Sequence, residues 1–144
     1  MLPMGTLGTN WNSGLLLGAS GAMELPGLGL PLKPVLSAGY FSLGHKTFTA
    51  DTFAFIPIQL SGRYALDMPD SPINCYGEIG GGVALETLTV SGAASSAMDG
   101  IGHAAVGGLY SLGSFSAFLE VTYNMLFSAT TTSSLLGVSV GLRF

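Results

Sequence analysis

The C-terminal stretch LGVSVGLRF, residues 136–144, decides the fold of this chain. Every second residue from Leu136 to Phe144 is large and apolar, whereas the residues between them are glycine, serine and one arginine. A period of two is typical of a β-strand with one apolar and one polar face. We therefore predict a strand here, with Arg143 on its polar face.

Segments further upstream repeat this alternation. Residues 115–127 and 73–90 carry their apolar side chains at odd positions, whereas residues 54–68 carry them at even positions. In these segments the charged side chains fall on the face opposite the apolar one. Three more segments follow the rule less sharply: residues 14–25, 33–43 and 101–112. The pattern predicts seven strands in all.

The composition indicates what surrounds these strands. The 144 residues have the length of one domain, residues 1–144, and 48% of them are hydrophobic while only 8% are charged. An ordinary soluble domain carries about 25% charged residues. Too few charges are present to cover a surface that faces water, so we expect the outside of the molecule to face lipid.

Only helices and closed barrels satisfy their own backbone hydrogen bonds in lipid. Two windows, residues 13–32 and 100–119, approach the length of about 20 apolar residues that a spanning helix needs. Glu24 and two prolines interrupt the first window, and glycine and serine crowd the second. The sequence therefore predicts an all-β fold, an antiparallel up-and-down transmembrane β-barrel.

The connections between the predicted strands alternate in character. The shorter ones are residues 26–31, 69–72 and 112–114, and the longer ones are residues 44–51, 91–99 and 128–134. Short turns belong to the periplasmic side of such barrels and longer loops to the outside. Because closure requires an even number of strands, either residues 1–9 form a short, rising eighth strand or the first strand is missing from this chain. We favour the short strand, which gives eight.

Several runs resemble a known group of proteins. The terminal GVSVGLRF resembles the signature by which the barrel-assembly machinery recognises outer-membrane barrels. The runs FIPIQLSGRYAL, CYGEIGGGVAL and FLEVTYNMLF are similar to the small, porin-like barrel families related to the outer-membrane proteins W, X and A. The resemblance covers most of residues 33–144. It implies a barrel in the outer membrane of a Gram-negative bacterium, with the assembly machinery as a partner through Phe144; the families include anchors, adhesins and small-solute channels.

Charge and cysteine content limit the partners. The net charge of −4 gives no basic patch, so we expect no nucleic acid. The single cysteine, Cys75, excludes an internal disulfide and a cysteine-based zinc site. We expect a monomer in a lipid bilayer with no cofactor and no metal. Residues 1–7 lack the basic and continuously apolar regions of a signal peptide.

Catalytic candidates are few. His103 lies on a predicted lumen face, but no serine nucleophile or carboxylate can be placed beside it from sequence, so we interpret it as structural. His45 is interpreted as a solvated loop residue. The run Gly80 to Gly82 lacks the following helix and lysine of a phosphate loop, and we assign it to strand curvature. The sequence therefore predicts no enzyme.

Polar side chains gather on the inward face of the predicted strands. The predicted lumen cluster consists of Arg63, Glu78, Glu86, His103, Glu120 and Arg143. Hairpin spacing pairs Arg63 with Glu78, and Glu120 with Arg143. Because an unpaired charge in a narrow interior is costly, we expect ion pairs that plug the lumen. Small lumen residues leave a polar conduit or a binding cavity as the alternative.

Aromatic residues fall at the predicted strand ends. Those expected near the periplasmic ends are Tyr64, Tyr110, Phe115 and Phe144, and those near the outer ends are Tyr123 and Phe127. This placement is typical of the aromatic girdles at membrane interfaces.

The function predicted from sequence is that of a non-enzymatic integral outer-membrane barrel, structural or adhesive, or a passive small-molecule route with a polar, ion-paired lumen. Three alternatives stay open: a small-solute pore or hydrophobic-ligand channel, an outer-membrane barrel enzyme, and a soluble ligand-binding barrel. The last requires a polar outside and an apolar inside, which is the reverse of the observed phase.

Overall fold

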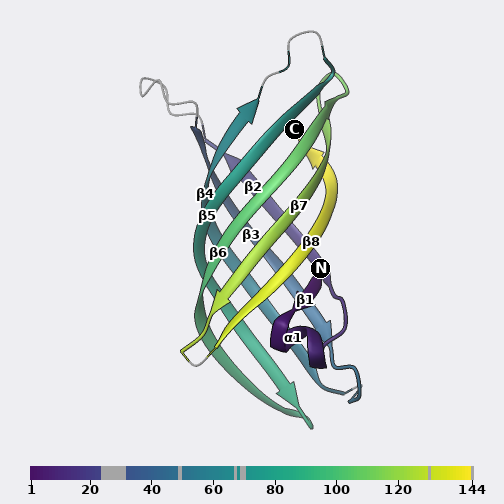
Figure 1. The fold of residues 1–144 in the computed structure, drawn as a ribbon, viewed down its shortest axis with the longest axis vertical. Coiled ribbons are helices and arrows are strands. Elements are labelled where there is room, and N and C mark those ends of the chain that lie inside the picture. The colour runs from purple at the N-terminus through teal and green to yellow at the C-terminus, as the bar shows by residue number, and fades with distance from the viewer. Residues whose placement is uncertain (24–31, 49, 67, 69–70, 130, 144) are drawn as a thin grey trace.

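The chain forms an eight-stranded antiparallel β-barrel (Figure 1). The computed structural model describes residues 1–23, 32–48, 50–66, 68, 71–129 and 131–143. The elements are β1 (Leu2–Met4), α1 (Gly5–Asn10), β2 (Leu15–Ala22), β3 (Leu32–Gly44), β4 (Thr52–Leu66), β5 (Ile73–Val90), β6 (Ala93–Ser111), β7 (Ser116–Phe127) and β8 (Thr132–Arg143). In the described part of the chain no helix is long and apolar enough to cross a membrane.

The strands form one sheet in the order β1-β8-β7-β6-β5-β4-β3-β2. Each strand from β2 to β7 pairs antiparallel with the next, and β1 pairs with the start of β8. This topology confirms the predicted up-and-down barrel. We call the end that carries the β3–β4, β5–β6 and β7–β8 connections the loop end, and the opposite end the turn end. Helix α1 lies at the loop end (Figure 1).

Side-chain exposure confirms the predicted phase of the strands. On β8, Val138 and Val140 are 67% and 77% exposed, whereas Leu135 is fully buried. Strands β4, β5 and β7 behave in the same way, with apolar residues exposed on the outward face: Ile56, Ile58, Leu60, Ile79, Val83, Leu85, Leu119 and Val121. The barrel therefore has an apolar outside along most of its strands.

The predicted long loop at residues 91–99 is wrong. Strands β5 and β6 continue to a two-residue turn at Ser91 and Gly92, whose φ angles are 51° and 83°. Positive φ at both central residues is typical of the type I′ hairpin turn. Residues 93–97 are exposed on both faces of this arm, and their side chains, alanine and serine only, do not alternate and give no strand signal.

The predicted short N-terminal strand is confirmed as β1, which rises toward the loop end along β8. It is shorter than residues 1–9, because the chain turns into α1 after Met4. Leu7 of this helix and the following Trp11 pack against buried apolar residues of the lumen. Burial of these side chains accounts for a helical turn that the sequence pattern does not predict.

The loop-end half of the lumen is filled by apolar side chains. The fully buried members include Phe41, Phe55, Leu126 and Leu135, and Trp11 and Leu16 pack against them. Full burial of one large apolar side chain contributes about 1.5–3 kcal/mol. This apolar plug closes the barrel at the loop end, where the sequence analysis had expected a polar interior.

Glycines in β5 allow the close packing of β4. A Cβ at Gly82 would lie 1.9 Å from the carbonyl oxygen of Ile58, and one at Gly80 would lie 2.3 Å from that of Leu60. No side chain fits at such separations, which supports the interpretation of this run as a device of strand curvature.

Candidate functional site

The turn-end half of the lumen holds the polar residues, and Arg63 with Glu78 forms its centre. Arg63 on β4 lies directly opposite Glu78 on β5. The guanidinium Nη2 is 2.6 Å and Nε 2.8 Å from Glu78 Oε2, and the two side chains are 8% and 4% exposed. The ion pair predicted between these two residues is present, and the pairing compensates two charges that would be costly alone.

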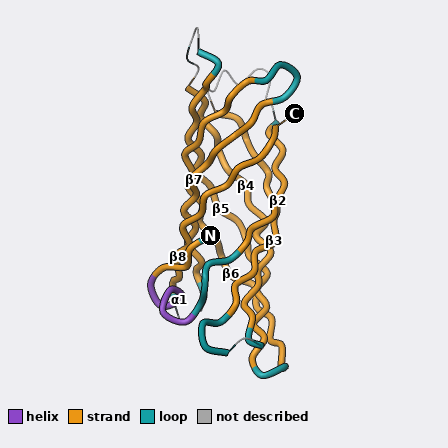
Figure 2. Tube along the Cα trace, turned by 90° about the vertical axis from the view of Figure 1, so that its right-hand side faces the viewer, coloured by secondary structure: helices purple, strands orange, loops and turns teal. Residues whose placement is uncertain are grey.

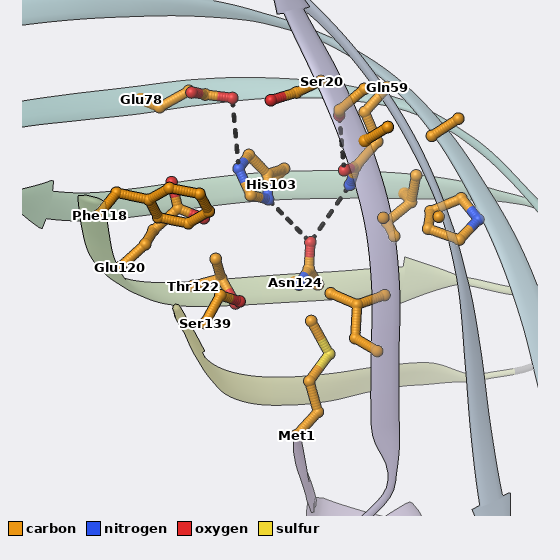
Figure 3. Close-up of a pocket in the computed structure, with 18 of the residues that line it drawn as sticks. Met1, Ser20, Gln59, Glu78, His103, Phe118, Glu120, Thr122, Asn124 and Ser139 are labelled. Carbon is orange, nitrogen blue, oxygen red and sulfur yellow. Dashed lines mark hydrogen bonds and ion pairs between the residues drawn. The ribbon is translucent and has the colours of Figure 1, made fainter. Parts of the chain in front are cut away.

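His103 on β6, the neighbour of β5, extends the cluster toward Asn124 on β7 (Figure 3). Its Nε2 lies 3.6 Å from Glu78 Oε1, and its Nδ1 lies 2.9 Å from Asn124 Oδ1. Because a carbonyl oxygen only accepts, Nδ1 is the donor in the second contact. Asn124 Oδ1 also accepts from Gln59 Nε2 at 3.2 Å, and Gln59 Oε1 accepts from Ser37 Oγ at 3.4 Å. A chain of polar contacts thus joins β3, β4, β5, β6 and β7.

The sequence analysis did not select Gln59 or Asn124. Both are buried, and both occupy inward positions of strands whose phase was known, at 8% and 4% exposure. Their inward position in the alternation could have identified them, because an amide side chain that is buried on the inward face needs a hydrogen-bond partner.

The predicted pairing of Glu120 with Arg143 is wrong. Glu120 lies opposite Ser139 on β8, and Arg143 is four residues further along that strand, about 13 Å at 3.3 Å per residue. Tyr76 stands between them: its hydroxyl donates to Glu120 Oε2 at 2.7 Å, and the Arg143 guanidinium lies 5.3 Å from its ring centre. Hairpin spacing alone does not anticipate a residue from a third strand.

Tyr76 also lies under Arg63, whose guanidinium carbon is 4.7 Å from the ring centre. Two cations therefore face one aromatic ring, while the phenol hydroxyl meets a carboxylate. A cation over an aromatic face is attracted by about 0.5–2 kcal/mol. Tyr76 is 2% exposed and connects the two charged groups that the sequence analysis had treated as separate pairs.

Glu86 does not join this cluster. It lies eight residues beyond Glu78 on β5, about 26 Å along the strand, toward the loop end. There it lies beside Asp99, whose carboxylate accepts a hydrogen bond from Ser128. Its Oε1 is buried and makes no hydrogen bond with the described residues. The alternation along β5 places Glu86 on the lumen side, as it does Glu78. Alternation does not indicate how far along the barrel axis a residue lies.

The two histidines differ in surroundings. His45 in the β3–β4 loop accepts at Nδ1 from the backbone N–H groups of Thr47 and Phe48, and its ring packs edge-on against Trp11. It is an ordered part of the loop rather than a free, solvated side chain. Among the described residues no group of three or more histidine, cysteine or carboxylate side chains could hold a metal ion.

The predicted girdle residues are mostly on the outside. Tyr64, Tyr110, Tyr123 and Phe127 are exposed, and Phe115 is partly buried. Phe144 lies outside the described residues, so the structure describes nothing at this position.

A cavity of about 180 Å³ lies between the polar residues and Met1 (Figure 3). Water takes about 30 Å³ in the liquid, so the volume suits about six waters or one small polar molecule. Thr122 is 3% exposed, and its Oγ1 makes no hydrogen bond with the described residues. The lining thus offers charged and hydroxyl groups to a small polar guest, but no nucleophile paired with a base is evident among them.

The comparisons with known proteins bear on the fold. No protein-family model matches the chain, and no curated protein matches it in sequence. Among solved structures, the chain is similar to the crystal structure of Neisserial surface protein A, with a TM-score of 0.72 and 16% identity. The match covers 93% of this chain and 88% of that one. At this identity the likeness establishes the fold, an eight-stranded β-barrel.

Proposed function

We propose that this chain is an integral outer-membrane β-barrel without enzymatic activity, whose closed lumen supports a surface formed by its loop end. One observation carries the proposal. Every charged residue of the described strands lies on the inward face: Lys33, Arg63, Glu78, Glu86, Asp99, Glu120 and Arg143. The outward face of the same strands is apolar. This arrangement suits lipid outside and a polar interior.

The lumen favours a scaffold over a pore. The apolar plug seals the loop end, and the Arg63–Glu78 pair with its neighbours occupies the other half. An eight-stranded barrel is just wide enough for side chains to fill it. The cavity between these two layers ends at the apolar plug, so it gives ions no continuous path through the barrel.

The loop end supports a structural or adhesive role. The β5–β6 arm continues beyond the other strands there, with exposed residues on both faces, and Phe48 of the β3–β4 loop is 61% exposed. Exposed aromatic and small polar side chains on a rigid support are suited to contacts with other molecules. The similar solved structure is, by its title, that of a surface protein, which agrees with this proposal.

The test places a fluorophore on single cysteines in a Cys75→Ser background. Val138 and Ser139 are neighbours on β8 that face opposite sides. After reconstitution into vesicles that contain brominated lipid, a label at Val138→Cys should be quenched strongly and a label at Ser139→Cys weakly.

Equal quenching at the two positions would contradict the membrane placement. When the chain is exported from a Gram-negative host behind an added signal peptide, it should be recovered with the outer-membrane fraction, and recovery in the soluble periplasmic fraction would contradict the proposal as well.

A further inference from the structure

The barrel has a seam between β2 and β8. Strand β1 covers only residues 134–136 of β8, so residues 137–143 of β8 have no strand partner on that side among the described residues. Strand β2 pairs with β3 along Leu15–Ala22 and with no second described strand. Figure 2 shows β8 and β2 on the two sides of this seam. The backbone N–H and C=O groups that point into the seam from both edges therefore have no described strand to pair with.

At its loop-end limit the seam is one strand wide. The amino group of Met1 donates to the Gly14 carbonyl at 2.7 Å, and Gly14 N–H donates back to the Met1 carbonyl at 2.9 Å. Two residues that exchange both bonds face each other directly in an antiparallel pair. Because Leu2 faces Leu136 on the other side, the chain at Met1 and Leu2 stands between Gly14, which directly precedes β2, and β8.

The two free edges are in phase with each other. If the line of β1 is continued past Met1, each further residue advances one position along each edge, which brings Leu17 across from Val140 and Gly18 across from Gly141. Leu17 and Val140 are both exposed on the outward face, at 64% and 77%. One inserted strand would thus meet matching faces on its two sides.

Direct pairing of β2 with β8 does not fit this geometry. Both strands run from the loop end to the turn end, so they would pair parallel in a barrel that is otherwise antiparallel. A strand that rises between them is antiparallel to both. It would also satisfy the backbone groups of both edges, which an acyl chain cannot do because it has neither donors nor acceptors.

We propose that the seam is an acceptor site for one extended peptide segment of about six residues, in line with β1 and running toward the loop end. Its apolar side chains would point outward between Leu17 and Val140. Its inward side chain nearest Ser20 and Arg143 would be polar or acidic, because it would lie beside the Arg143 guanidinium, which packs over the rings of Tyr76 and Phe118. Occupation of the seam would separate the lumen cavity, which Ser20 and Arg143 also line, from the surroundings of the barrel.

The cost of leaving the backbone groups of the two edges unpaired depends on the proposed membrane placement. The register of an added strand between β2 and β8 does not depend on it. The test therefore measures register. In a Cys75→Ser background, six residues are added ahead of Met1 in the phase described, with a cysteine at the third residue before Met1. That position should face Val140. The partner cysteine is introduced at Val140 or, as a matched control, at Leu119.

Leu119 is outward-facing like Val140 and lies directly opposite it on β7, one strand further from the seam. A disulfide needs Cα atoms within about 7 Å, and two strand spacings exceed this. We expect the cysteine of the extension to cross-link with Val140→Cys at least about tenfold more than with Leu119→Cys. An extension of the same composition shifted by one residue should lose this preference.

Equal cross-linking with both partners, or by both extensions, would overturn the proposal. The unextended chain gives a second reading: a disulfide between Leu17→Cys and Val140→Cys would mean that the edges close on each other without an added strand, which also overturns it. Lipid quenching at Val138→Cys in the unextended chain reports the membrane placement separately, so failure of that placement is distinguished from failure of the acceptor site.

Discussion

Loss of one partner of the Arg63–Glu78 pair should weaken the barrel more than loss of both. Arg63→Met keeps a side chain of similar length but removes the cation, and it leaves the Glu78 carboxylate buried, with His103 Nε2 at 3.6 Å from its Oε1. Arg63→Met together with Glu78→Gln removes both charges and keeps a hydrogen-bonding group beside His103. The two variants differ in one respect, which is whether a charge remains without its partner.

The expected size follows from burial. With 8% and 4% of the two side chains exposed, the pair belongs to the buried class, for which loss of one partner costs about 3–5 kcal/mol. The contact of Arg63 with the Tyr76 ring adds about 0.5–2 kcal/mol to the single change. The double variant should recover most of the free energy that Arg63→Met loses by leaving the Glu78 carboxylate without a partner. Replacement of a buried ion pair by two uncharged side chains often changes the free energy of unfolding little.

Urea unfolding of the refolded barrel measures these free energies. Trp11, the single tryptophan, packs against Phe53 at the loop end and reports unfolding of the barrel without lying next to the altered pair. Lys46→Met is the matched control, since it removes a cation from an exposed loop contact with the Gly8 carbonyl and should cost about 0–1 kcal/mol. If Arg63→Met costs no more than this control, the pair is solvated and the buried cluster is not what holds this half of the lumen.

Three further outcomes are expected. Glu120→Gln keeps an acceptor for the Tyr76 hydroxyl and should cost only about 1 kcal/mol in the same unfolding measurement, so a loss as large as that of Arg63→Met would contradict the assigned contact. Gly82→Ala should prevent folding or lower the unfolding midpoint sharply, because its Cβ would meet the Ile58 carbonyl, whereas Gly77→Ala on the same strand has open space and should fold normally; equal behaviour would refute the packing argument. In planar bilayers the chain should carry no steady current, because the apolar plug closes the lumen, and an ohmic current would show an open path.

The alternation of apolar and polar residues predicted the barrel because it can be seen within each strand and reflects the different environments of the two strand faces. In a strand such as β8, lipid on one side and lumen on the other impose a period of two that residues 136–144 display directly. The same reasoning gave the Arg63–Glu78 pair, since the two residues lie in adjacent strands joined by one connection. The sequence therefore predicted the fold, the phase and this pair, but not the register of the β7–β8 hairpin, which places Glu120 opposite Ser139 rather than Arg143.

Other parts of the site depend on information that one hairpin does not contain. Tyr76 contacts Glu120, 44 residues away, and Gln59 on β4 contacts Asn124 on β7, beyond the two strands between them. Such contacts depend on strand tilt and on which side chains reach the axis at the same height. For the same reason the sequence analysis placed Glu86 with the other carboxylates, although it lies at the opposite end of the lumen.

The division of the lumen into an apolar and a polar half follows from the same limit. Phe41, Phe55 and Leu126 share the inward phase with Gln59 and Glu78, so alternation treats them alike. Only their height separates them: the apolar residues lie where α1 folds over the loop end, and the polar ones lie where the seam leaves the interior open. An apolar layer under a helix excludes water, and a polar layer beside an open seam can be hydrated. The position of the seam therefore agrees with the position of the Arg63–Glu78 pair, whereas Glu86 and Asp99 lie at the loop end.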